Sequence, residues 1–89
     1  MAYSKKMAGE NKAIFARAAE LLPATGWSAE TEEITDRGKL APSTVAQRDR
    51  AEALLYDEFP DVSPQRVRHQ VNRFMMRERG RVWREQQGK

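Results

Sequence analysis

An amphipathic pattern in the last third of the chain constrains the fold most strongly, because it predicts one long helix. Ser63 is a residue type that favours the N-cap position, and Pro64 follows at the first helical position, where its missing N–H costs nothing. Val67, Val71 and Phe74 then recur at helical spacing and form an apolar side. At about 100° per residue, the opposite side is polar. That opposite side carries Gln65, His69, Asn72, Arg73 and Met76.

Three further helices are expected before this one. The first covers about residues 9–22 and ends at Pro23, because the residue before a proline disfavours the α region. The second is short, about 29–37, with Ser28 as its N-cap and three glutamates near its start, where the helix dipole favours negative charge. The third covers about 42–58.

The third helix is expected to bury an apolar side and to hold a charged run in solvent. The buried side would consist of Ala51, Leu54, Leu55 and Phe59, and the charged run of Arg48, Asp49, Arg50 and Glu52. Trp27 is expected to fill the core between the first two helices. The last helix either continues through Gly80 to Trp83 or beyond, or bends there, since an interior glycine costs ~1 kcal/mol relative to alanine.

No segment shows the alternation of a β-strand, so the predicted fold is all-α, a small four-helix domain with a basic C-terminal helix. Flexible ends at 1–8 and 86–89 would flank a single domain over 9–85. A hydrophobic fraction of 39% predicts a thin core. The absence of cysteine and the presence of one histidine argue against disulfides and a metal site. The lack of a long apolar run predicts a cytoplasmic protein that does not enter a membrane.

Positive charge is concentrated at the C-terminal end of the sequence. Residues 64–89 carry eight basic and two acidic side chains, a net charge of +6, whereas the whole chain has +3. Seven of the eight cations are arginines. Because the planar guanidinium pairs well with phosphate and with guanine edges, this asymmetry indicates a polyanionic partner.

Two stretches share a pattern that starts a helix. L-A-P-S-T-V begins at Leu40 and V-S-P-Q-R-V begins at Val62, each with an apolar residue, a small residue, proline, two polar residues and valine. The pattern resembles the turn and recognition-helix start of helix-turn-helix DNA-binding domains, which often read V-S-x-x-T-V. The resemblance implies a helix-turn-helix-like domain, with the second copy as the better recognition helix. In the first copy it implies DNA-facing roles for Ser43, Thr44 and Gln47.

Helix geometry then assigns roles on the last helix. We expect base-edge contacts from Gln65, His69, Asn72 and Arg73, because amides suit adenine and arginine suits guanine. We expect phosphate contacts from Arg66, Arg68, Arg77 and Arg79, with Arg81 and Arg84 extending the track. The function expected is DNA binding in the regulation of transcription or replication, or in DNA packaging.

Several alternatives remain open from the sequence. The basic helix would also suit RNA, or an acidic protein partner if the chain is a small phage-encoded inhibitor or adaptor of a host complex. A solvated cationic face that keeps the protein soluble is a further interpretation. Met75, Met76, Val82 and Trp83 form either a homodimer seam or part of the core. No nucleophile stands beside a base and no glycine-rich phosphate loop is present, so an enzyme and a cofactor are not expected. Glu30, Glu32 and Glu33 would point in different directions and are not expected to bind metal.

Overall fold

The computed structural model describes residues 5–33 and 38–88, and over these residues the chain is all-helical. It contains three helices: α1 (Lys5–Ala24), α2 (Pro42–Glu58) and α3 (Pro64–Gln87). No strand occurs in these ranges. The all-α prediction is therefore confirmed, but the described residues form three helices and not four.

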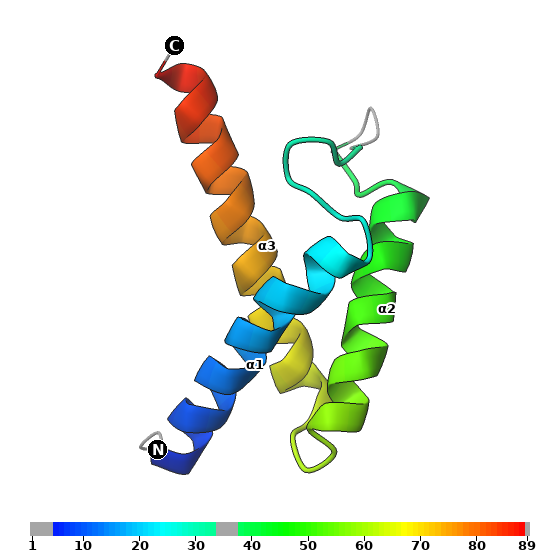
Figure 1. Cartoon of the computed structure of the whole chain (residues 1–89), viewed down its shortest axis with the longest axis vertical. Helices are drawn as coiled ribbons and strands as arrows, with labels where there is room; N and C mark the ends of the chain where they lie inside the picture. The colour runs from blue at the N-terminus through cyan, green and yellow to red at the C-terminus, as the bar shows by residue number, and fades with distance from the viewer. Residues whose placement is uncertain (1–4, 34–37, 89) are drawn as a thin grey trace.

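α1 and α3 cross each other, and α2 packs against both of them (Figure 1). The last turns of α3 extend beyond the ends of the other two helices (Figure 1). This extension contributes to an elongated outline of 41 × 27 × 24 Å. No helix within the described part of the chain is both long enough and apolar enough to cross a membrane.

Local capping signals determine where α2 and α3 begin. The Ser63 hydroxyl accepts a hydrogen bond from the backbone N–H of Arg66, and Pro64 occupies the first turn, as predicted. Pro42 does the same at the start of α2, where Ala41 offers no capping side chain. The chain between Phe59 and Ser63 is short, and the Val62 N–H donates to the Phe59 carbonyl to close the turn.

The end of α1 lies beyond the predicted stop. The helix includes Pro23 in its last turn and finishes at Ala24. Gly26 then adopts a φ of 92°, which glycine reaches without steric cost, and the Trp27 N–H donates to the Leu22 carbonyl at 3.3 Å. Pro23 lacks the N–H for one intrahelical hydrogen bond, and the helix ends one residue later. This left-handed cap turns Trp27 back into the core.

The predicted helix at 29–37 is not formed over residues 29–33, and its remaining residues lie outside the described ranges. Ser28 does act as a cap, because its hydroxyl accepts from the Glu30 N–H and its carbonyl accepts from the Glu32 N–H at 2.9 Å. Residues 29–31 form a turn, and the chain does not continue as a helix at residues 32 and 33. The only large apolar residue of the predicted helix is at position 34, so an extended helix would have no apolar side to bury.

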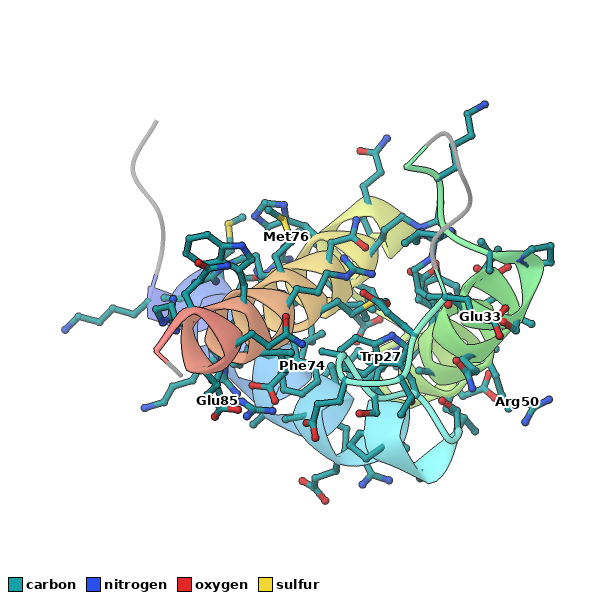
Figure 2. All side chains as sticks on the ribbon, turned by 90° about the horizontal axis from the view of Figure 1, so that it is seen from above. Trp27, Glu33, Arg50, Phe74, Met76 and Glu85 are labelled. Atoms are coloured by element: carbon teal, nitrogen blue, oxygen red, sulfur yellow. The ribbon has the colours of Figure 1, made fainter. Side chains whose placement is uncertain are left out.

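Phe74 occupies the centre of the core, and its side chain touches aromatic rings from two other segments. Its ring centroid lies 5.8 Å from Phe15 in an edge-on arrangement and 6.1 Å from Trp27. Figure 2 shows Trp27 and Phe74 between the helices. The predicted core role of Trp27 is confirmed, since it is 4% exposed. The surrounding cluster includes Ile14, Ala18, Leu21, Leu22, Ala51, Leu55, Val62, Val67, Val71 and Met75.

The predicted buried side of α2 is partly wrong. Leu54 is 46% exposed, whereas Glu52 in the expected solvated run is 1% exposed. Thr44 is also buried at 1%. The buried stripe therefore passes through Thr44, Ala51, Glu52 and Leu55. A polar group can occupy such a stripe when it has a partner, and Glu52 has one on α3, Arg68, that sequence periodicity does not reveal.

The ends of the chain are more helical than predicted. α1 begins at Lys5, inside the expected loose start, and α3 runs on to Gln87, inside the expected tail. Gly80 lies within α3 without interrupting it, so the continuous alternative is the one observed.

Candidate nucleic-acid interface

One side of α3 faces away from the core over its full length. We refer to it as the outward face, and it consists of Gln65, His69, Asn72, Arg73, Met76 and Trp83. All of these side chains are exposed except that of Asn72, which is half-buried. The face exists because Val67, Val71 and Phe74 turn the opposite side of the helix into the core. Figure 2 shows Met76 on the side of α3 away from α1.

The arginine on the α2 side of α3 is bound to a buried carboxylate. Arg68 donates through Nε and Nη2 to Glu52 Oε1, at 3.1 and 2.9 Å, and the Glu52 side chain is 2% exposed. Tyr56 also donates its hydroxyl to Glu52, at 3.1 Å. The hydrogen bond to Glu52 raises the pKa of Arg68 above its ordinary value. Arg68 therefore joins α3 to α2, and its charge is largely neutralised.

A second carboxylate neutralises an arginine farther along α3. Glu32 accepts hydrogen bonds from Arg79 Nε and Nη2 and from the Trp27 indole N–H, the last at 2.9 Å. Its side chain is 4% exposed. Arg81 binds three carboxylates, those of Glu30, Glu78 and Glu85. These hydrogen bonds raise the pKa of Arg81, with Glu85 contributing most.

The predicted role of the glutamates at 30 and 32 therefore needs correction. They were expected to stabilise the start of a short helix, but they bind arginines of α3 instead. Long-range attraction between the negative N-terminal half and the positive C-terminal helix accounts for this pairing. Glu33 is exposed, and its backbone carbonyl accepts from the Ala41 N–H at 3.2 Å.

Arg66 is bound on the α1 side of α3. Its Nη2 lies 3.2 Å from Glu10 Oε1, 3.0 Å from Asn11 Oδ1 and 3.3 Å from the Met7 carbonyl. Its side chain is 26% exposed. Four of the predicted phosphate-binding arginines, namely Arg66, Arg68, Arg79 and Arg81, are thus paired with carboxylates that lie earlier in the chain.

The remaining arginines of α3 leave more of their charge open to solvent. Arg73 donates from Nη1 to Gln70 Oε1 at 3.0 Å, and its Cζ lies 5.5 Å from the Phe15 ring centroid. Arg77 lies over both Phe15 and Phe74, at 4.9 and 5.2 Å, and of the described carboxylates only that of the neighbouring Glu78 pairs with it, at 3.5 Å. Arg84 is exposed and forms no ion pair with a described residue. At 100° per residue, these three arginines follow one flank of α3, the side that faces α1.

A groove separates α1 from this flank of α3. Its volume is about 420 Å³, and it opens to solvent. The lining residues are Ala8, Asn11, Lys12 and Phe15 from α1 and His69, Gln70 and Arg73 from α3. His69 and Arg73 were predicted only as base-edge contacts on the last helix, and sequence patterns indicated neither the groove nor a role for the α1 residues that line it. The spacing of Asn11 and Phe15, one helical turn apart, was the available signal, but nothing local indicates which helix it faces.

The three candidates on α2 are not presented together at the surface. Ser43 is exposed and Gln47 is half-buried, but Thr44 is 1% exposed and faces the core. The predicted DNA-facing role of Thr44 is wrong for this fold, because the buried stripe of α2 begins at that residue.

The apolar residues near the C-terminus divide into two pairs. Met75 and Val82 are buried, at 1% and 8% exposed, whereas Met76 and Trp83 are 67% and 61% exposed. The first pair therefore belongs to the packed side of α3, and the second pair lies on its outward face. No group of acidic, histidine or cysteine side chains suited to a metal ion occurs within the described ranges.

Comparison with known proteins adds no family. The chain matches no protein-family model, no curated protein and no solved structure at a significant level.

Proposed function

We propose that the protein binds nucleic acid, and preferentially duplex DNA, through the outward face of α3. The observation that carries the proposal is the position of Gln65, His69 and Arg73 on an uncovered side of a 24-residue helix. Amide, imidazole and guanidinium groups in this setting can hydrogen-bond to base edges. In this proposal α2 and α3 form a helix-turn-helix-like pair, with α3 as the recognition helix.

The helical form of the interface favours DNA over RNA. The major groove of B-DNA is wide enough to admit an α-helix, whereas the deep, narrow major groove of A-form RNA is not readable by side chains. A straight helix of this length extends for about 36 Å at 1.5 Å per residue. The first turns of α3 can therefore enter the groove, as the N-terminal residues of a recognition helix do, while the later turns remain free to contact the backbone.

The distribution of ion pairs refines the assignment of phosphate contacts. Arg73, Arg77 and Arg84 retain exposed charge along the α1-facing flank, so we assign the main backbone contacts to them. Arg68 and Arg79 are engaged with nearly buried carboxylates, so we assign them to holding α3 in place. Binding would then be asymmetric, with one strand along the α1-facing flank.

A salt titration of duplex binding tests this proposal. We would measure fluorescence anisotropy of a labelled random-sequence duplex, comparing Arg73→Gln with Arg50→Gln. Arg50 is an equally charged residue on α2 and points away from α3 (Figure 2). Loss of one phosphate contact should reduce the slope of log affinity against log salt by about 0.9 in Arg73→Gln only. Absence of duplex binding at low salt would exclude the proposal.

A protein partner is a second candidate function, and the exposure of Met76 and Trp83 favours it. These two side chains are seven residues apart and lie on the same side of α3, and each is followed in sequence by an exposed cation, Arg77 or Arg84. An acidic protein surface with apolar residues would complement this composition. A second copy of the chain complements it less well, because self-association would bring like charges close together.

Trp83 fluorescence separates the two candidates. In a Trp27→Phe background, Trp83 is the sole tryptophan, and quenching by acrylamide reports its exposure. Bound duplex should lower this quenching, because Arg84 beside Trp83 is one of the assigned backbone contacts. Strong protection of Trp83 by an acidic, apolar peptide, together with no effect of duplex, would support the protein-partner function.

A further inference from the structure

The groove between α1 and α3 has the composition of an anion site. Three basic side chains, Lys12, His69 and Arg73, line it, and no acidic side chain does. Lys12 and His69 are exposed and form no ion pair with any residue in the described ranges. This distinguishes the groove from the parts of α3 where earlier carboxylates pair with Arg66, Arg68, Arg79 and Arg81.

Arg73 is held in place without being neutralised. Its Nη1 donates to the Oε1 atom of Gln70, a residue that is 2% exposed, and the Phe15 ring lies 5.5 Å from its Cζ. An amide oxygen and an aromatic face both orient a guanidinium, but neither carries a negative charge. The remaining N–H groups of Arg73 are therefore ordered in advance and keep their full positive charge for a ligand.

We infer that this groove binds a phosphate group and that α1 is part of the nucleic-acid interface. The inference rests on the proposed function, because the phosphate is taken to belong to the backbone of the strand that lies along the α1-facing flank. Arg73 would provide paired N–H donors, Lys12 a mobile point charge and His69 a single ring N–H. Each of the two non-bridging oxygens of a backbone phosphate can accept more than one hydrogen bond, so together they can serve all three side chains.

The position of the groove fits this role. His69 and Arg73 belong both to the groove and to the outward face, so a phosphate that they bind would lie beside Gln65 and Asn72, which are left to contact base edges. Arg77 and Arg84 continue the same flank toward the C-terminus. Lys12 would thus fix the register of the strand at one end of this track, which is the usual role of backbone contacts.

A single reporter nucleus makes the inference directly testable. His69 is the only histidine of the chain, so its imidazole proton resonance can be followed without assignment ambiguity. We would titrate inorganic phosphate and, separately, a random-sequence duplex into the wild-type protein, Lys12→Gln and Lys6→Gln. Lys6 is the matched control, because it is an exposed lysine on α1 about 240° around the helix from Lys12.

We expect both probes to shift the His69 resonance in the wild-type protein and in Lys6→Gln. Lys12→Gln should weaken duplex binding by about three- to tenfold for every sequence and lower its salt slope by about 0.9. If the duplex binds and shifts His69, but inorganic phosphate does not and Lys12→Gln behaves like Lys6→Gln, the groove inference is overturned and the proposed function stands. If phosphate shifts His69 but no duplex binds, the groove holds phosphate from a small molecule, and the proposed function is overturned. If neither phosphate nor the duplex binds, the groove inference and the proposed function are both overturned.

Discussion

Arg68 on α3 closes over Glu52 on α2 so that the carboxylate is almost completely buried while the guanidinium stays half exposed. The Glu52 side chain is 2% exposed and the Arg68 side chain is 50% exposed, and Arg68 Nη2 lies 2.9 Å from Glu52 Oε1. Arg48 approaches the same carboxylate at 3.8 Å. A buried carboxylate is stable only with such partners, so this pair fixes the position of α2 against α3.

Removing Arg68 should therefore destabilise the fold more than its exposure suggests. We expect Arg68→Ala to lower the free energy of unfolding by about 2 kcal/mol, below the value for a fully buried pair because water reaches the guanidinium. The measurement is chemical denaturation followed by circular dichroism. Arg50→Ala, an exposed cation on α2, should change stability by less than about 0.5 kcal/mol. Equal effects of the two variants would contradict the structural role of Arg68.

Glu32 should be as important as Glu52, because it fastens the 27–33 segment to α3. Glu32→Ala removes the acceptor for both Arg79 and the Trp27 indole, and we expect a loss of about 2 kcal/mol. Trp27 fluorescence should also shift to the red as the indole gains access to water. Glu33→Ala serves as the control, since that side chain is exposed. An unchanged stability in Glu32→Ala would rule out this fastening role.

The raised pKa of Tyr56 predicts a loss of folding stability at alkaline pH. Partial burial, and then the negative charge of Glu52, raise the pKa of Tyr56 above 10.0. The folded state thus retains the phenolic proton more strongly than the unfolded state. The stabilisation that protonated Tyr56 gives the folded state is fully present below pH 10, and it is lost as the pH rises through the higher pKa of the folded state.

Tyrosinate absorbance in a Tyr3→Phe background isolates this titration, because Tyr3 and Tyr56 are the only tyrosines. Tyr56→Phe should weaken the pH dependence of stability above pH 10. Ionisation of Tyr56 at or below the value for free tyrosine would refute the prediction.

Gly80 offers a stabilising substitution. It lies in the interior of α3 with negative φ, and an added Cβ would meet only the flexible end of Arg84, at 3.4 Å. Gly80→Ala should increase the free energy of unfolding by up to ~1 kcal/mol, which corresponds to a melting temperature higher by about 4 to 8 °C. Gly26→Ala should have the opposite effect, because its φ of 92° is strained for alanine. A melting temperature unchanged by Gly80→Ala would show that the side chain is not accommodated as described.

Features encoded by neighbouring residues could be predicted from the sequence. Ser63 and Pro64 indicate the start of α3 through local capping, and the spacing of Val67, Val71 and Phe74 indicates which side it buries. The same applies to the bounds of α2. In each case the physical signal lies within a few residues of the feature that it determines.

Features that depend on distant partners could not be predicted in the same way. Glu52 looks solvated by its neighbours in sequence, yet Arg68 makes its burial favourable. The contribution of Lys12 to the groove likewise follows from how α1 crosses α3. Sequence patterns indicate the charge of these side chains, but only the packing of the helices determines which charges meet.

The pairing of α3 with earlier glutamates makes its effective charge a property of the folded state. Glu10, Glu30, Glu32 and Glu52 neutralise four of its arginines only when the chain is assembled. A synthetic peptide of residues 64–89 would present all of these cations at once and should bind any polyanion more tightly than the intact domain does. Folding therefore lowers the positive charge that α3 presents to any polyanion. In the proposed function, selectivity among nucleic acids then depends on the few side chains that stay uncovered.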